Sequence, residues 1–265
     1  MGKREMVITL VFLFIIGGCL LLYMIREAFL NNIIEHEFSF PDFPKSLGSV
    51  SIFFISDIHR RTISDKVVNP VIGKADIVVI GGDLTEKGVS FEKVKANLMK
   101  LKQIGPVYFV WGNNDYEVDY HKLDAILLEL GIKVLANTAV TFESAEGEKF
   151  CLLGVDDLSQ ERDRLDLALL DAEESGFKIL ASHYPNITNK ILPEHKIRLV
   201  LSGHTHGGQI HILGYSPHER GKIKKLDSTI LLISNGYGTT AIPLRLGAPA
   251  ECHLITLNGK SGEER

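Results

Sequence analysis

Residues 107–117, VYFVWGNNDYE, join an apolar, strand-like run directly to a glycine, two asparagines and an aspartate. A strand that ends in amide and carboxylate side chains either enters a simple turn or delivers those side chains to a site. The rest of the chain decides between the two, because four other apolar runs end in the same way.

These four runs, FFISDIH, VVIGGD, ILASH and LVLSGHTH, all stop at residues that can bind a cation. Together with the run that ends at Asn113, they supply Asp57, His59, Asp83, His183, His204 and His206. The carboxyl ends of parallel strands meet at one edge of a sheet, so these side chains are expected to converge. A single aspartate or histidine at such a place is usually a turn or core residue, whereas five strand ends together predict a metal site.

The expected donors are carboxylate and amide oxygens and imidazole nitrogens, without a thiolate. This set suits Mn²⁺, Fe or Zn²⁺, whereas Mg²⁺ prefers oxygen ligands and water. Asp83 follows two glycines, which allow a tight turn in which one carboxylate bridges two ions. Two divalent cations, with Mn²⁺ as the first expectation, would generate a hydroxide and stabilise an in-line displacement on an anionic phosphoester.

The apolar runs between residues 50 and 257 are short and nearly continuous, which indicates strands covered on both faces. Between them, the spacing of apolar residues predicts helices at 90–104, 120–130 and 164–174, the first with Ser90 as its N-cap. This alternation predicts one layered α/β domain over residues 50–257. Residues 27–49 are expected to be a linker, and residues 258–265 a polar tail.

Residues 1–26 contain the stretch MVITLVFLFIIGGCLLLYMI, which carries no charged residue. About 20 apolar residues suffice for a helix that crosses a bilayer, so this segment is predicted to be a single-pass anchor in the cell membrane. Lys3 and Arg4 precede it, and the positive-inside rule therefore places the N-terminus in the cytoplasm and the large domain outside it. A cleaved signal peptide and lipidation at Cys19 are the alternatives.

Composition restricts the functions that are open to the chain. The formal net charge is −4 at pH 7, and this mild acidity, with the expected place outside the cytoplasm, disfavours nucleic acid as a substrate. The three cysteines have no metal-type spacing and are expected to be unpaired apolar residues. The sequence indicates no protein partner.

In chain order, SDIH, GGDL, GNND, ASHYP and SGHTHGGQI resemble the motifs of the calcineurin-like metallophosphoesterases. The resemblance covers residues 50–257 and implies a four-layer αββα sandwich, here preceded by one N-terminal transmembrane helix. It also implies a metal-dependent phosphohydrolase of the phosphodiesterase or pyrophosphatase type, which acts by attack of metal-bound hydroxide. The implied ligands are Asp57, His59, His206 and Asp83 for one ion, and Asp83, Asn113, His183 and His204 for the other.

The apolar N-terminus and the tail PLRLGAPAECHLITL are similar to the membrane-associated bacterial branch of this family. Some members of that branch hydrolyse lipid-linked sugar nucleotides. The resemblance therefore suggests a phosphoester substrate that is lipid-linked or a nucleotide sugar. The competing interpretation is a catalytically weak, metal-containing protein that binds or senses a phosphate ligand.

Asn114 departs from the family pattern, and with Asp115 it forms the pair of candidate catalytic residues. The usual motif reads GNHD, whose histidine is assigned as the proton donor to the leaving oxygen, whereas this chain reads GNND. An amide donates hydrogen bonds but releases no proton at neutral pH, so acidic leaving groups are expected unless His121 or His211 fills the gap. Asp115 either orients a ligand imidazole or shapes a turn.

Two basic features complete the candidate site. Arg60 and Arg61 directly follow His59 and are expected to clamp a substrate phosphate, with a solvated surface pair as the alternative. The run ERGKIKKL, residues 219–226, is either a solvated loop or a contact to anionic lipid.

Overall fold

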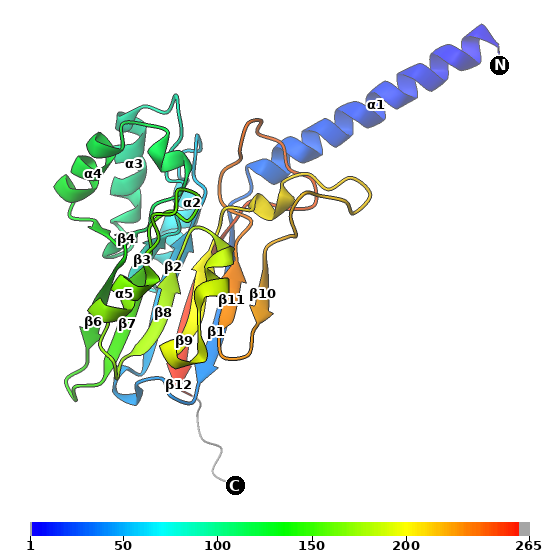
Figure 1. Ribbon diagram of the computed structural model, residues 1–265. Coiled ribbons are helices and arrows are strands. Elements are labelled where there is room, and N and C mark those ends of the chain that lie inside the picture. The colour runs from blue at the N-terminus through cyan, green and yellow to red at the C-terminus, as the bar shows by residue number, and fades with distance from the viewer. Residues whose placement is uncertain (1, 260–265) are drawn as a thin grey trace.

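Two six-stranded sheets lie face to face in the computed structural model, which describes residues 2–259 (Figure 1). The first sheet has the order β1 (Asn32–Phe40), β12 (Glu251–Gly259), β2 (Ser49–Ile55), β3 (Ile77–Ile80), β4 (Val107–Phe109) and β5 (Lys133–Val134). The second has the order β10 (Lys222–Lys225), β11 (Ile230–Ile233), β9 (Ile197–Ser202), β8 (Phe177–Ala181), β7 (Lys149–Gly154) and β6 (Thr138–Glu143).

Helices cover the outer face of each sheet. They are α2 (Asp65–Val68), α3 (Phe91–Leu101) and α4 (Tyr120–Glu129) on the first sheet and α5 (Leu165–Asp171) on the second. Short 3₁₀ turns are η1 (Lys45–Leu47), η2 (Asn69–Val71), η3 (Asn114–Tyr116), η4 (Pro185–Lys190), η5 (Pro193–His195) and η6 (His206–Gly208). The expected αββα order of layers is therefore confirmed.

Strand β2 shows why the sequence runs without polar interruptions. Phe53 and Ile55 face the helices, while Ile52 and Phe54 face the second sheet, and all four side chains are fully buried. Successive side chains of a strand point to opposite faces, so a strand between two covered faces must be apolar at every position.

The directions of the strands bring the candidate residues to one end of the sandwich. Strands β2, β3 and β4 pair in parallel in the first sheet, and β8 and β9 pair in parallel in the second. Helix α3 connects β3 to β4 and begins at its expected N-cap, where Ser90 Oγ accepts a hydrogen bond from Lys93 N at 3.3 Å. Each parallel connection returns the chain to the same end of the sheet, so the carboxyl ends of these strands lie together.

The structure corrects the expectation of a linker at residues 27–49, because most of this segment belongs to the folded domain. Strand β1 pairs in parallel with β12 along its whole length, from Asn32 opposite Glu251 to Phe40 opposite Gly259. The partner strand lies more than two hundred residues away in the sequence, so local composition could not reveal it. At the other end, Asn258 and Gly259 of the expected polar tail are part of β12, and residues 260–265 lie outside the described residues.

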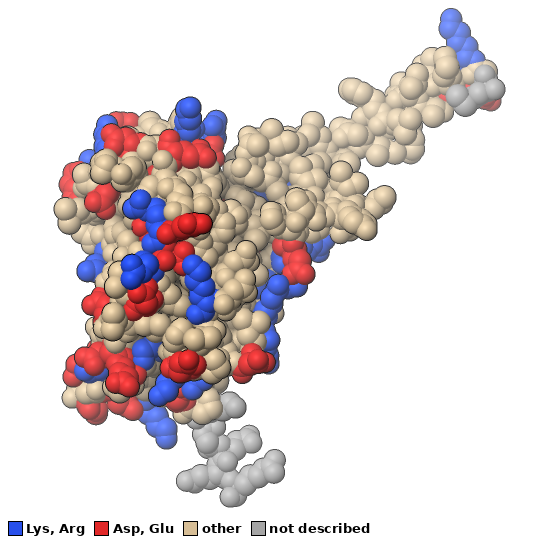
Figure 2. All heavy atoms as spheres, in the orientation of Figure 1, with Lys and Arg blue, Asp and Glu red and all other residues tan. Residues whose placement is uncertain are grey.

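Helix α1 (Lys3–Ala28) projects away from the sandwich and is long and apolar enough to cross a membrane. None of its most apolar 18-residue window is buried against the domain. On the face drawn in Figure 2, the charged side chains at the free end of this helix are followed by an uncharged surface that reaches toward the domain, where Arg26 in the last turn is again exposed. Length and apolar surface are what a bilayer-spanning helix requires.

Candidate metal centre

The seven candidate ligands lie just beyond the carboxyl ends of five strands, where the two sheets meet. Asp57 and His59 follow β2, Asp83 follows β3, Asn113 follows β4, His183 follows β8, and His204 and His206 follow β9. The two sheets thus contribute from both sides to one cluster.

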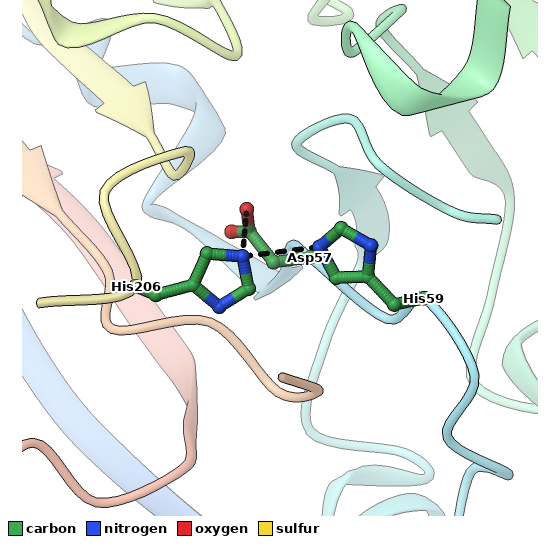
Figure 3. Close-up of side chains that lie close together, drawn as sticks. All are labelled: Asp57, His59 and His206. Atoms are coloured by element: carbon green, nitrogen blue, oxygen red, sulfur yellow. Dashed lines mark hydrogen bonds and ion pairs between the residues drawn. The ribbon is translucent and has the colours of Figure 1, made fainter. Parts of the chain in front are cut away.

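The first group of donors consists of Asp57, His59 and His206, which point toward one another in Figure 3. One donor atom from each lies within 4.8 Å of the others. The two imidazoles face each other with 3.0 Å between their Nε2 atoms, and His206 Nε2 lies 3.5 Å from Asp57 Oδ1. All three side chains are buried.

Asp83 connects this group to a second one. Its Oδ2 lies 3.6 Å from His59 Nε2 and 3.2 Å from His183 Nε2. Asp57, Asp83 and His183 also bring donor atoms within 4.8 Å of one another, and His204 Nδ1 lies 3.3 Å from His183 Nε2. The Asp83 carboxylate therefore lies between histidines of both groups, which is the position of a bridging ligand.

Asn113 lies at the edge of the cluster. Its Oδ1 accepts a hydrogen bond from the Tyr184 hydroxyl at 3.1 Å, and the residue lines the cleft beside Asp83. Tyr184 also packs against His204, with 3.8 Å between ring centroids. The tyrosine thus holds two of the candidate ligands, and its place in ASHYP was the only sequence signal for it.

Left-handed backbone angles recur among the ligands. The φ angles are 54° at Asp57, 50° at His59, 51° at Asp83, 70° at His204 and 50° at His206. Such angles are unfavourable for residues other than glycine and concentrate at functional sites, where the surrounding structure enforces them. Here the enforcement includes two hydrogen bonds to Asp83 O, from Ile58 N at 2.8 Å and from His59 N at 3.1 Å.

Two glycines are required by close approach to the carboxylates. A Cβ atom at Gly112 would lie 2.3 Å from Asp83 Oδ1, and one at Gly203 would lie 2.3 Å from Asp57 Oδ2. No side chain fits at either position, so the glycines of the GNND and SGHTH motifs give the carboxylates their space.

Burial and mutual charge set the protonation of the cluster. Burial raises the pKa of Asp57. Burial alone would lower the pKa of His183, but the adjacent Asp83 carboxylate raises it to about 10. Burial and the charge of His183 lower the pKa of His204 to about 4, and burial with the charge of His59 brings the pKa of His206 well below its usual value.

These features fit divalent cations. Two buried carboxylates need positive charge nearby, and His204 and His206 are neutral imidazoles with lone pairs available for a metal. Oxygen and imidazole donors within 4.8 Å of one another match the ligand preferences of Mn²⁺, Fe or Zn²⁺. The described residues therefore form a donor set that suits two divalent ions around Asp83.

Glu86 supports the cluster and was not anticipated. Its Oε2 lies 2.9 Å from His59 Nδ1, on the side of the ring away from the other ligands, and its Oε1 contacts Arg60 Nε. A carboxylate behind a metal-binding histidine fixes the ring orientation and raises the basicity of the ligand nitrogen. The available signal was the spacing in GGDLTE, where Glu86 follows Asp83 by three positions.

Arg245 is a second unanticipated residue, fully buried behind His206. Its Nη1 donates to His206 O at 3.2 Å and to Ala248 O at 2.7 Å, and its Nη2 lies 3.4 Å from His206 Nδ1. Burial lowers its pKa to about 10, so the guanidinium remains charged at neutral pH. This fixed positive charge favours the neutral form of His206.

Asn114 and Asp115 take positions that the sequence left open. Asn114 N donates to Asp83 Oδ1 at 2.8 Å and Asn114 Nδ2 donates to Asp83 Oδ2 at 2.7 Å. Asp115 is buried and accepts hydrogen bonds from Thr85 N at 3.0 Å and from Gly112 N at 2.9 Å. Asp115 therefore ties the loop after β3 to the loop after β4, and Asn114 fixes the Asp83 carboxylate.

Arg61 does not face the cluster, which corrects the expectation that it clamps a substrate phosphate. Its guanidinium is buried against the end of α1 and donates to Phe29 O at 2.9 Å, Leu30 O at 2.6 Å and Tyr237 O at 2.5 Å. It also stacks on the Tyr237 ring at 3.6 Å. The free carbonyls at a helix C-terminus attract such a cation, which explains its position. Arg60, in contrast, is exposed and stays beside Glu86.

A cleft of about 370 Å³ opens over the cluster. It is lined by Asp83, Asn113, Asn114, His204, Thr205, His206, Gly208, Gln209, Pro217, His218 and Thr240. His121 and His211, the expected substitutes for the missing motif histidine, are not among these residues: His121 is exposed on α4, and His211 Nε2 lies 2.7 Å from Gly207 O. His218 does line the cleft.

Comparison with known proteins identifies relatives across the domain. A family model for calcineurin-like phosphoesterases matches residues 50–208. The Bacillus subtilis protein YpbG is 43% identical over 231 residues, which are 86% of this chain and 88% of that protein. A Danio rerio transmembrane protein with a metallophosphoesterase domain is 31% identical over 92% of this chain and 61% of its own length.

A Helicobacter pylori metallophosphoesterase is 32% identical over 80% of this chain and 60% of its own length. This chain therefore spans about three fifths of the fish and Helicobacter proteins. The range matched by the family model begins at Val50 and ends at Gly208, so it includes all seven candidate ligands. The chain belongs to the calcineurin-like phosphoesterase family.

Proposed function

We propose that this protein is a membrane-tethered phosphohydrolase that works with two divalent cations held around Asp83. The observation that carries the proposal is the position of the Asp83 carboxylate, within 3.6 Å of His59 and 3.2 Å of His183, at the junction of two buried donor groups. Asp57, His59 and His206 are proposed for one ion, and Asn113, His183 and His204 for the other, with Asp83 shared. Mn²⁺ is the proposed native metal, with Fe and Zn²⁺ as alternatives.

When bound, two such cations lower the pKa of water and neutralise the charge of a phosphoryl group. The chain supplies the rest. Glu86 holds the His59 ring in one orientation, Asn114 holds both oxygens of Asp83, and Asp115 keeps their two loops together. Arg60 has an exposed side chain beside Glu86 and is proposed to contact a substrate phosphate.

The bond cleaved is proposed to be a phosphodiester or a phosphoanhydride with an acidic leaving group. Asn114 cannot supply a proton, and its amide is committed to Asp83. General acid catalysis typically contributes about 10²–10⁴-fold, so its absence penalises poor leaving groups most.

His218 is the proposed source of a proton for leaving groups that need one. It lines the same cleft as Asn114 and lies in the loop between η6 and β10. Gly208 gives this loop room, since a Cβ there would lie 1.7 Å from Ser216 Oγ, and Ser216 Oγ donates to Gly208 O at 3.0 Å. The second glycine of the HTHGG motif therefore positions the loop that carries His218.

Membrane tethering is supported by α1 and by the transmembrane relatives. A single pass with the catalytic domain outside the cytoplasm is proposed from Lys3 and Arg4. A lipid-linked substrate is proposed for the same reason, because a domain tethered to the membrane meets membrane-bound phosphoesters most often.

The test uses the full chain, because β1 and the end of α1 belong to the folded unit. The purified protein is stripped of metal in detergent, reloaded with Mn²⁺, Zn²⁺ or Mg²⁺, and assayed on an activated phosphomonoester, an activated phosphodiester and a UDP-sugar. Metal-dependent turnover that is lost in Asp83→Asn supports the proposal and shows the substrate class. Binding of two metal ions per chain without any turnover would instead support a protein that binds a phosphate ligand.

A further inference from the structure

Residues 212–215, ILGY, form an exposed two-residue hairpin turn that we call the apolar turn. Ile212 and Tyr215 exchange two backbone hydrogen bonds, both 2.9 Å long. Leu213 and Gly214 between them have φ angles of 51° and 85°, as in a type I′ turn. Asn-Gly is the usual choice for such turns, because asparagine tolerates positive φ and water. Leucine offers neither advantage.

The side chains of the apolar turn are unusually exposed. Leu213 is 99% exposed, Tyr215 is 86% exposed, and Ile212 is exposed as well. Ile242, on the neighbouring loop before Arg245, adds a further exposed apolar side chain. For Leu213, the left-handed backbone conformation and the exposure of an apolar side chain to water are both unfavourable. A group of exposed apolar side chains such as this one marks an interaction site.

The apolar turn is held firmly beside the end of α1. At its base, His211 N donates to Leu246 O at 2.8 Å and Leu246 N donates to Gln209 O at 2.9 Å. The residue before Leu246, Arg245, donates a hydrogen bond from its backbone N to Met24 O of α1 at 3.0 Å. Figure 1 shows this loop extending out of the sandwich next to the part of α1 that joins the domain.

The domain also has no flexible spacer that would let it turn relative to α1. Only residues 29–31 separate the end of α1 from β1. Glu27 and Ala28 are buried, and Ala250 N donates a hydrogen bond to Glu27 O at 3.2 Å. Arg61 donates to the carbonyls of Phe29 and Leu30, which follow α1. The orientation of the domain relative to α1 is therefore fixed by its own hydrogen bonds.

We propose that the apolar turn and Ile242 insert into the lipid bilayer in which α1 is anchored. The proposal rests on the membrane tethering proposed above and adds a second, specific contact with the same bilayer. Met24, to which the neighbouring loop bonds, lies inside the apolar stretch of α1. Figure 2 shows an uncharged surface that continues from α1 onto the segment protruding beside it. The side chains suit this place, because aliphatic residues enter the acyl region and tyrosine favours the interface.

Insertion would bring the cleft to the membrane surface. Pro217 and His218, which line the cleft, lie two and three residues after the apolar turn. Thr240, also in the lining, lies two residues before Ile242. Gln209 holds the two loops together, because its Nε2 donates to Thr240 O at 3.1 Å and its Oε1 accepts from Thr240 N at 3.0 Å. A phosphoester presented at the bilayer surface then reaches the metal centre without leaving the membrane.

The test places a fluorescent probe on the apolar turn. The full-chain variant Leu213→Trp is reconstituted into phosphatidylcholine vesicles with either ordinary or brominated acyl chains. The expected result is that brominated lipid lowers the added tryptophan emission by about twofold or more, as insertion of 5–10 Å into the bilayer boundary requires. The native Trp111 is nearly buried and contributes the same background in every variant.

Leu170→Trp is the matched control, because Leu170 is 81% exposed on α5, away from α1. Its emission is expected to be the same in both lipids. Tyr215→Trp provides a second probe if Leu213→Trp folds poorly. Unchanged emission from both turn variants, in chains that float with vesicles and resist alkaline extraction, would overturn the proposal. Chains that fail to float would instead contradict the membrane tether itself.

Discussion

Asn114 holds both oxygens of Asp83, one with its backbone N–H at 2.8 Å and the other with its side-chain amide at 2.7 Å. Asn114 thus positions the carboxylate that lies between the two donor groups. Without this clamp, the carboxylate would lose the orientation needed between His59 and His183.

The first prediction concerns this clamp. Asn114→Ala removes the side-chain hydrogen bond to Asp83 and should weaken binding of the second Mn²⁺ by about 10–100-fold, the usual effect of losing a group that orients a ligand. Isothermal titration calorimetry of the metal-stripped protein with Mn²⁺ measures this affinity. Asn113→Ala, which removes a proposed ligand, should weaken binding at least as much. Wild-type affinity in Asn114→Ala would mean that the hydrogen bond has no role in holding metal.

The second prediction concerns Glu86, which lies behind His59. Glu86→Gln keeps the shape but removes the charge that orients the ring, so metal affinity and turnover should fall by about 10–100-fold. Glu92→Gln, an exposed glutamate at the start of α3, is the control and should leave both unchanged. Equal affinities in the two variants would contradict the role given to Glu86.

The third prediction separates the two adjacent arginines. Arg61→Met leaves the carbonyls of Phe29, Leu30 and Tyr237 without their donor and should lower the free energy of unfolding by about 1–3 kcal/mol or more, the usual cost of leaving buried polar groups unsatisfied. Arg60→Met should change stability by less than about 0.5 kcal/mol, because the side chain is exposed, and should raise KM. Denaturation in detergent and steady-state kinetics measure the two effects. If Arg61→Met raises KM at unchanged stability, Arg61 binds substrate after all.

The fourth prediction tests His218 as the proton donor. His218→Asn should slow a substrate with a poor leaving group by about 10²-fold or more, and should barely affect one with an acidic leaving group. His121→Asn, on the surface of α4, is the control. The ratio of kcat/KM for the two substrates is the readout, and Asn114→His in the same background should restore part of the loss. A ratio equal to that of the wild type would remove His218 from the reaction.

The fifth prediction is a pH dependence of stability at the β1–β12 pairing. His253 is buried, and burial together with the charge of His36, whose Nε2 lies 3.0 Å from His253 Nδ1, lowers the pKa of His253 to about 3. The unfolded chain binds a proton near pH 6.5 and the folded chain does not, so stability falls as the pH drops from about 6.5 toward 3.

The expected slope from His253 is about 1.4 kcal/mol per pH unit within this window. His253→Gln should reduce the slope by that amount. Denaturation followed by Trp111 fluorescence at a series of pH values compares the two proteins, so titration of the metal centre cancels in the difference. Parallel curves for the wild type and the variant would mean that His253 remains accessible to protons in the folded state.

The candidate ligands could be found from the sequence because each one follows an apolar strand. Buried apolar runs are followed directly by Asp57, Asp83 and His204. Because the carboxyl ends of parallel strands lie at one edge of the sheet, the residues that follow them are brought together there. Helix α3 was equally accessible, since Ser90 and the buried Val94, Leu98 and Leu101 are a local pattern. The apolar stretch of α1 depends on composition alone. Local signals of this kind do not need the rest of the chain.

The remaining features depend on partners that are distant in sequence, and only the tertiary structure decided them. Strand β1 is a strand because β12 lies beside it, and Arg61 is structural because the carbonyls of Phe29 and Leu30, just after α1, lie against it. Glu86 and Arg245 gain their roles from contacts with His59 and His206. The sequence by itself determined which chemistry the strand ends carry, because burial dictates the apolar runs. Long-range packing, which no local pattern encodes, decided which polar groups contact the candidate ligands. It also decided which face of the domain lies next to α1.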